Sequence, residues 1–320
     1  MPLNKEVITK RNGLIKKFGF KLIKVFDTNE HEDYKDVVLV YDSKDKLKKV
    51  LRIGEHRTKN FLYNGYKGKY LIIPKIYQIN TSKDNKYEIE EYIEGEMIIK
   101  YLDNPLANKI LPDKYINRLI KSFWEFQEIA KKVKLPRYEV LDQKIKKHLN
   151  YAIKLMDNPN KVVKLLNTEK VRSFFQDNNY PCKWKFSVDN LIVTPKNKLA
   201  FIDLAKVGKR FWGYDLGWIF WPIWFCLPIE EYESANDHLK YLERLFKKVE
   251  KTASNGNKID IIYSGYLIIL ERVIGTLYDL AADISHARKI NKMKNKRKAF
   301  IKFLNGLLNL IVNKIENMAG

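Results

Sequence analysis

Cysteine is scarce in this sequence. The chain has two cysteines in 320 residues, Cys182 and Cys226. Two such positions give neither a disulfide framework nor the paired spacing of a zinc site. We therefore expect reduced thiols and a cytoplasmic protein.

Long apolar runs are also missing. The longest, Leu216 to Leu227, is too short for a membrane-spanning helix and contains Pro222. The first residues lack the apolar core of a signal peptide. We also find no internal repeat, no low-complexity linker and no Cys/His metal cluster. These absences predict a soluble protein with no membrane span.

Acidic residues are outnumbered. Lysine and arginine total 60 against 38 aspartates and glutamates, a net charge of +22, and only 11 of the cations are arginine. An excess of lysine is typical of AT-rich genomes, so the charge is weak evidence of function. It favours contact with an anion (a nucleotide, a nucleic acid or an anionic lipid) without choosing among them.

What the chain does contain is apolar and patterned. Hydrophobic residues make up 45% and aromatic residues 13%, which is typical of a packed globule. After a helical pattern over Lys5–Phe18, β-forming residues predict strands over Phe20–Phe26, Val37–Tyr41, Lys49–Ile53, Leu71–Ile79 and Tyr87–Ile93. Helical segments are then predicted over Lys114–Val133, Val140–Met156, Lys161–Phe175, Tyr232–Val249, Ile259–Ala287 and Ala299–Ile315.

A β-hairpin interrupts the helical part. Its strands, Leu191–Thr194 and Leu199–Ile202, are joined by Pro195–Lys198, with Asp189-Asn190 before the first strand and Asp203 after the second. The hairpin therefore brings two hard oxygen ligands to one end, which suits a divalent cation that holds phosphates.

This layout resembles the aminoglycoside phosphotransferase and choline kinase family, whose catalytic segment reads H-G-D-x-x-x-x-N, a hairpin, I-D and then Y-D-L. Asn190, Ile202-Asp203 and Tyr214-Asp215-Leu216 fall at the family's spacing. The first half of the motif differs from the family's, because Lys183-Trp184-Lys185 stands where the family has His-Gly-Asp.

The resemblance implies an α+β, two-lobed protein-kinase-like fold, with a small five-stranded antiparallel N-lobe and a larger, mostly helical C-lobe. We place the nucleotide-binding-type lobe at residues 1–95 and the helical lobe at residues 96–320. The hairpin of residues 182–204 is assigned to the second lobe.

The resemblance also implies Mg²⁺ and ATP as cofactors. Asp203 and Asn190 would bind the metal, and the backbone of Tyr92 and Ile93 would contact adenine. Asp215 would support the catalytic loop, and Arg52 stands where the family's phosphate-binding lysine is expected. The alternatives are a turn residue for Asp203, a helix cap for Asp215 and an exposed strand arginine for Arg52.

Four departures bear on catalysis. The stretch Thr28–Lys35 has no glycine where the phosphate-binding loop should lie, and Arg52 replaces the lysine. No acidic residue occurs between Arg57 and Tyr70 to pair with that cation, and Glu55 is the nearest candidate. Lys185 occupies the position of the catalytic aspartate, and Asp189 is a weak replacement.

Three functions remain open. The four departures favour a degenerate phosphotransferase, or pseudokinase, that binds a nucleotide, a metabolite or a protein partner. The second function is a divergent ATP-dependent phosphotransferase that acts on a small-molecule hydroxyl, and the retained Asn190 and Asp203 support it. A polyanion- or nucleic-acid-binding protein on the same scaffold is the third. The basic run from Arg288 to Lys302 would suit it, although a solvated connection between helices is the favoured interpretation of that run.

Overall fold

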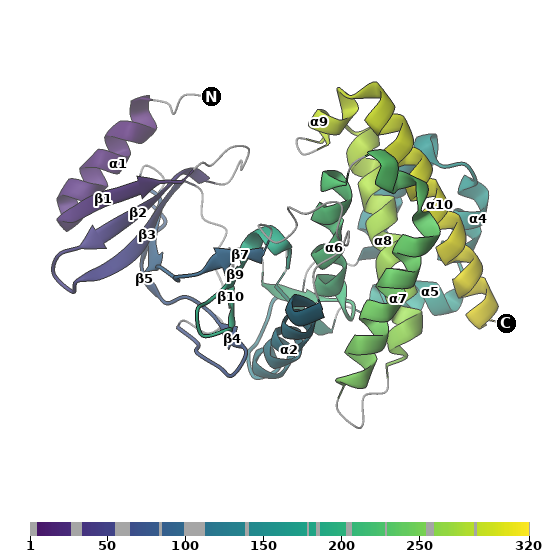
Figure 1. The fold of residues 1–320 in the computed structure, drawn as a ribbon, viewed down its shortest axis with the longest axis horizontal. Helices are drawn as coiled ribbons and strands as arrows, with labels where there is room; N and C mark the ends of the chain where they lie inside the picture. The colour runs from purple at the N-terminus through teal and green to yellow at the C-terminus, as the bar shows by residue number, and fades with distance from the viewer. Residues whose placement is uncertain are drawn as a thin grey trace. The chain divides into compact units, whose positions relative to one another are not determined.

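The computed structural model describes residues 5–26, 34–54, 65–82, 85–98, 113–137, 141–177, 179–183, 186–202, 207–227, 229–253, 259–284 and 287–319 (Figure 1). The chain forms two compact units. The first comprises Met1–Glu96 and Ile192–Lys206, and the second comprises Met97–Leu191 and Val207–Gly320. The sequence placed the division after residue 95 and the hairpin with the helical lobe. In the structure most of the hairpin belongs to the first unit.

The first unit is built on a five-stranded antiparallel sheet. Its strands are β1 (Phe20–Val25), β2 (Tyr34–Asp42), β3 (Leu47–Gly54), β5 (Ile76–Asn80) and β6 (Tyr87–Glu91), in the order β1-β2-β3-β6-β5. The predicted five-stranded antiparallel sheet is confirmed.

A second, four-stranded sheet receives the hairpin. Its order is β4 (Leu71–Ile72), β10 (Leu199–Phe201), β9 (Leu191–Val193) and β7 (Glu96–Met97), and β4 pairs with β10 in parallel. The sequence predicted one strand over Leu71–Ile79, but β4 and β5 lie in different sheets. The residues between them include Pro74, which cannot donate to a ladder hydrogen bond. Because β10 pairs with β4, most of the hairpin belongs to the first unit.

Helix α1 (Lys5–Phe18) covers one face of the five-stranded sheet. The core between them contains Leu14, Phe20, Val38, Val40, Leu51, Ile53, Tyr87 and Ile89. The alternation of strand side chains sends every second residue to this face, and Arg52, Glu88 and Glu90 therefore lie on the other face.

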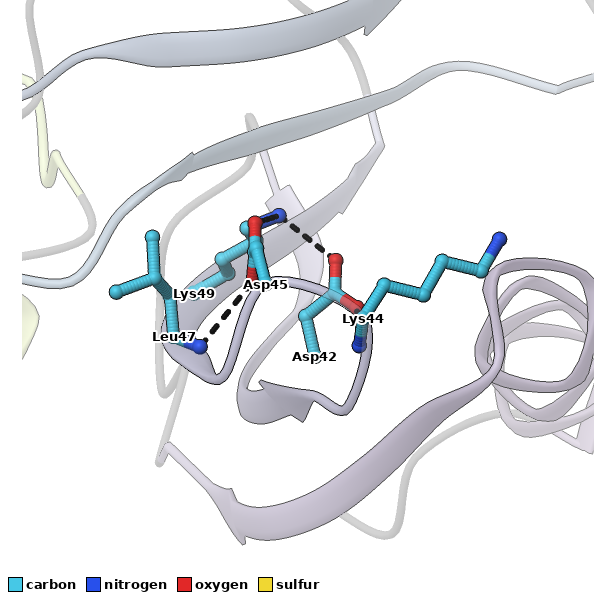
Figure 2. Close-up of polar contacts among 5 residues, drawn as sticks. All are labelled: Asp42, Lys44, Asp45, Leu47 and Lys49. Carbon is cyan, nitrogen blue, oxygen red and sulfur yellow. Dashed lines mark hydrogen bonds and ion pairs between the residues drawn. The ribbon is translucent and has the colours of Figure 1, made fainter.

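The β2–β3 turn is closed by a buried lysine (Figure 2). Nζ of Lys49 lies 2.7 Å from Oδ2 of Asp42 and 2.5 Å from Oδ2 of Asp45. The same carboxylates accept from the backbone, Asp42 from Lys44 N–H and Asp45 from Leu47 N–H. The ammonium group therefore ties both ends of the turn together and helps to hold the register of β2 against β3.

The second unit is mostly helical, as predicted. Its helices are α2 (Asp113–Ala130), α3 (Leu141–Ala152), α4 (Pro159–Leu166), α5 (Glu169–Gln176), α6 (Tyr214–Cys226), α7 (Ala235–Lys251), α8 (Ile261–Ala281), α9 (Arg288–Asn291) and α10 (Lys294–Ala319). Short strands β8 (Tyr180–Cys182) and β11 (Gly208–Arg210) pair in an antiparallel ladder.

Helix α8 is the core of this unit and packs against α3, α6, α7 and α10 (Figure 1). Among the described residues it is the one helix long and apolar enough to cross a membrane, and 89% of its apolar window is buried inside the protein. It carries a buried ion pair in its middle, between Arg272 and the adjacent Glu271. The Arg272 guanidinium also lies 4.5 Å from the centre of the Trp218 ring of α6.

Candidate functional site

Two of the predicted site residues, Lys185 and Asp203, lie outside the described residues. The predicted metal pair of Asn190 and Asp203 is therefore not placed, and the replacement of the catalytic aspartate by Lys185 rests on the sequence. Both stay predictions. The remaining site residues lie in the described parts of the two units, and each unit is treated in turn.

In the second unit, Asp215 supports the segment that precedes the hairpin. Its Oδ2 accepts a hydrogen bond from the backbone N–H of Lys183 at 2.7 Å, and its side chain is buried. Asp215 lies in the first turn of α6, whose cap position is Gly213 with a φ of 72°. The aspartate therefore acts on the loop rather than as the helix cap that we considered. This contact is of the kind that the resemblance implies for Asp215.

Asp189 and Asn190 are held by a residue that the sequence argument missed. Ser187 Oγ donates to Asp189 Oδ1 in a short contact, and it accepts from Asn190 Nδ2 at 3.2 Å. The backbone N–H of Asn190 donates to Ser187 O at 2.8 Å, closing a single turn of 3₁₀ helix over Val188–Asn190. Serine and aspartate next to a strand start commonly form such local turns, and that signal was available in the sequence.

The Ser187 contacts have a chemical consequence for both candidates. Asn190 Nδ2 donates to Ser187, and Oδ1 is the atom of this side chain whose chemistry suits a cation. Asp189 already accepts a hydrogen bond from the same hydroxyl, so its carboxylate is engaged within the loop rather than extended from it. The arrangement suits a positioned ligand loop better than a free general base.

In the first unit, Arg52 of β3 is committed to a carboxylate of the neighbouring strand. Its Nη2 lies 2.6 Å and its Nε 2.8 Å from Oε1 of Glu90 in β6. The side chains of Arg52 and Glu90 are 12% and 9% exposed, so the pair is largely excluded from water. Glu88, also buried, lies directly across from Arg52 in the strand register. Sequence reasoning sought the partner on a following helix and missed this cross-strand one.

Burial dominates the electrostatics of this pair. It raises the pKa of Glu90 to about 7, against the opposing effect of Arg52, and Glu88 raises it further. Two carboxylates and one guanidinium thus share the face of the sheet that lies away from α1. The Arg52 guanidinium in this group is paired with the buried Glu90.

The raised pKa of Glu90 predicts a pH-dependent stability. The usual pKa of a glutamate is 4.5, and that of Glu90 in the folded chain is about 7. Between these two pH values Glu90 is protonated in the folded chain and ionised in the unfolded chain. The free energy of unfolding should therefore fall as the pH rises through this window, by at most about 3 kcal/mol. Urea denaturation between about pH 5 and about pH 8 measures it.

Glu90→Gln is the control for this effect, because glutamine keeps a hydrogen-bond acceptor for Arg52 and cannot ionise. The difference in unfolding free energy between wild type and variant should change across the window and be flat above it. A difference that does not vary with pH would show that Glu90 titrates normally.

The two residues predicted to contact adenine, Tyr92 and Ile93, directly follow β6. Tyr92 and Ile93 are half-buried and lie between β6 and β7, and Lys48 approaches the Tyr92 ring at 5.8 Å. Among contacts between described residues, no hydrogen bond involves the backbone of Tyr92 or Ile93. Gly95 comes next with a φ of 150°, and a Cβ there would lie 2.3 Å from the carbonyl oxygen of Val193 in β9. The close approach of Gly95 thus places the segment after β6 directly against the hairpin.

The described residues show no cluster of three or more His, Cys, Asp or Glu side chains that could hold a metal ion. A cavity of about 40 Å³ lies between α3, α4 and α5, lined in part by Leu149, Leu166 and Phe175. None of the predicted site residues lines it.

Comparison with known proteins identifies the fold. No protein-family model and no curated protein matches the sequence. Among solved structures, the aminoglycoside phosphotransferase of Alicyclobacillus acidocaldarius matches with a TM-score of 0.55 over 92% of this chain and 93% of that one, at 12% identity. A mutant of aminoglycoside 2'-phosphotransferase-IIIa, solved as a GDP complex, matches at 0.56 over 92% and 98%, with 14% identity.

The macrolide 2'-phosphotransferase MphH of Brachybacterium faecium is a third match, at a TM-score of 0.51 over 92% of this chain and 97% of that one, with 12% identity. Likeness at such identities establishes the fold and leaves activity to be argued from residues. The chain thus has the two-lobed α+β fold of these phosphotransferases, and the resemblance drawn from the sequence is confirmed at that level.

Proposed function

We propose that this chain is a degenerate phosphotransferase, a pseudokinase that binds a nucleotide, a metabolite or a protein partner without transferring phosphate. The observation that carries the proposal is the Arg52–Glu90 pair. The cation at the phosphate-binding strand position is neutralised by a buried carboxylate of the next strand, 2.6 Å away. In a working kinase the corresponding lysine pairs with a helix glutamate and still contacts phosphate.

A triphosphate does not fit the charges around Arg52. Arg52 is the cation of a group whose two carboxylates, Glu88 and Glu90, are both buried. An incoming phosphate would have to compete with Glu90 for the guanidinium and would meet two carboxylates in a poorly hydrated setting. We therefore derive no phosphoryl-transfer step through bound ATP.

The base position supports the same conclusion. Lys185 stands where the resemblance places the catalytic aspartate, and a protonated lysine cannot accept the proton of an attacking hydroxyl. A positioned general base contributes about 10²–10⁴-fold to such a rate. Asp189 is held by Ser187 and is not proposed as a substitute.

Nucleoside binding is the part of the family's function that the described residues could still perform. The backbone of Tyr92 and Ile93 carries donors and acceptors that no contact between described residues uses. The GDP complex of a structural neighbour shows that this fold can hold a nucleotide. We propose that base contacts dominate and phosphate contacts add little.

An active phosphotransferase is the competing function, and two contacts favour it. Asp215 still holds the backbone of Lys183, and Ser187 still orients Asn190. With Asp203, these residues would supply the loop support and the oxygen ligands for Mg²⁺, which when bound would neutralise phosphate charge.

A comparison of ligands in thermal melts separates the two functions. A ligand at about 100 times its Kd stabilises by roughly 2.7 kcal/mol, which raises Tm by at least about 2–4 °C for a chain of this size. We expect adenosine and ATP to give similar rises, with no added effect of Mg²⁺, and no ADP to form with small-molecule hydroxyls. The reason is that Arg52, at the phosphate-binding position, is already paired with Glu90.

Asp203→Asn is the diagnostic variant and Asp237→Asn, on the exposed face of α7, is the matched control. A larger rise with magnesium and ATP that disappears only in Asp203→Asn, together with phosphate transfer, would establish an active enzyme. If no nucleoside or nucleotide raises Tm, the binding function belongs to a metabolite or a partner instead.

A further inference from the structure

The corner between α9 and α10 carries an unusual density of positive charge. From Arg288 to Lys302 eight of fifteen residues are lysine or arginine and none is acidic, against 60 of 320 in the whole chain. Six of these side chains are exposed and form what we call the basic stripe: Arg288, Lys289, Lys292, Lys294, Lys298 and Lys302. The stripe lies entirely within the second unit (Figure 1).

The corner is a built structure and not a loose connection. Asn291 donates through Nδ2 to the carbonyl of Leu280, at the end of α8, and to Oδ1 of Asp283. Its Oδ1 accepts from Nε of Arg297 in α10. Ile290 is buried beneath it. One asparagine thus ties α8, α9 and α10 together and fixes the direction in which the stripe leaves the corner.

The lysines of α10 stand in line. Lys294, Lys298 and Lys302 are four residues apart, which places them on one face of the helix at intervals of about 6 Å. The other face is fully engaged in the core, where Phe300, Phe303 and Leu304 are at most 1% exposed. The stripe is therefore a row of ammonium groups along a rigid rod, continued around the corner by the α9 cations.

These charges are not balanced within the described residues. The stripe makes one ion pair there, between Arg288 and Asp283 at 3.7 Å. Exposed lysines elsewhere do have carboxylate partners, for example Lys131 with Glu128, Lys161 with Glu316 and Lys240 with Asp237. The first turn of α10 holds no acidic residue, although acidic residues are the ones that a helix start favours.

We propose that the basic stripe binds the phosphate backbone of a nucleic acid, at a site separate from the nucleoside site proposed above. A row of cations matches a linear chain of phosphates. The corner offers no exposed aromatic ring on which a base could stack, because Phe300 and Phe303 are buried. Binding is accordingly independent of sequence and driven by the release of counterions.

An anionic membrane fits the corner less well. A surface helix that enters a bilayer needs an exposed apolar face, and the apolar face of α10 is buried in the protein. Met293, 46% exposed, is the one large apolar side chain that the corner offers. The stripe therefore has charge for a membrane surface but little to insert into it.

The test is binding of a fluorescent RNA of about 20 nucleotides, and of its duplex, to the full-length protein between about 50 and about 200 mM salt. The variant is Lys294→Gln/Lys298→Gln/Lys302→Gln. Its matched control, Lys131→Gln/Lys161→Gln/Lys240→Gln, removes the same charge from the paired lysines. Equal Tm values show that both fold, and loss of a cation from the start of α10 should not destabilise it.

We expect the stripe variant to bind at least about tenfold more weakly at the lower salt, and its slope of log K against log salt to be smaller by about 2–3. The control should bind within about twofold of wild type. The proposal is overturned if neither RNA form binds, if both variants lose affinity equally, or if vesicles containing phosphatidylserine bind while RNA does not.

Discussion

Replacing Arg272 by leucine is expected to lower the free energy of unfolding by about 3–5 kcal/mol. The substitution leaves the carboxylate of Glu271, 2% exposed, buried without the guanidinium beside it. It also removes the cation from the faces of Trp218 and Tyr214, whose ring centres lie 4.5 and 5.6 Å away. Urea denaturation of the full-length chain gives the difference directly.

Two controls separate the buried pair from loss of packing. In Glu271→Leu/Arg272→Met both charges are replaced by apolar groups, so the double variant should be more stable than Arg272→Leu alone. Arg288→Leu breaks an exposed pair with Asp283 and should change stability by no more than about 0.5 kcal/mol. A loss below about 1 kcal/mol in Arg272→Leu would contradict the prediction.

Gly95→Ala is expected to cost about 2–5 kcal/mol. The new Cβ would lie 2.3 Å from the carbonyl oxygen of Val193 and 2.7 Å from Cγ2 of Ile192, and a backbone atom cannot swing aside as a side chain can. The φ of 150° adds strain for any residue with a side chain. Because β7 and β9 are neighbours in the four-stranded sheet, the substitution should separate them.

Gly13→Ala in α1 provides the opposite control. No atom lies within 4 Å of a Cβ at Gly13, and its backbone is helical. Alanine there should raise stability by roughly 0.5–1 kcal/mol through its higher helix propensity. If both alanines had similar effects, the close approach of Gly95 to the hairpin would not be a constraint. Thermal and urea denaturation serve for both variants.

The elements that could be predicted from sequence are those with a clear period. The five-stranded sheet, α1 and the amphipathic α2 and α7 follow from alternation and helical spacing. Helix α6 was missed as a helix because Leu216–Leu227 is apolar on every side and contains Pro222, so it has no period to detect. The single helix predicted over Lys161–Phe175 ends at Leu166 and restarts at Glu169, with Asn167 and Thr168 between them.

The candidate site was predictable only where its geometry is local. The spacing of Asn190 and Asp215 within the motif could be read along the chain, and the Ser187 turn lies within three residues of Asn190. The partner of Arg52 could not be read in this way. Glu90 is 38 residues away, and its contact depends on the pairing of β3 with β6, two strands that are not consecutive in the chain.

The chain passes from one compact unit to the other three times, after Glu96, Leu191 and Lys206. During synthesis the first unit cannot be finished when its own amino-terminal residues have emerged, because β9 and β10 are made about a hundred residues later. Until then β4 and β7 lack the neighbours that order them in the four-stranded sheet. Maturation of the nascent chain is therefore not a simple progression from the amino terminus, because a chain that ends at Glu96 lacks β9 and β10, two of the four strands of that sheet.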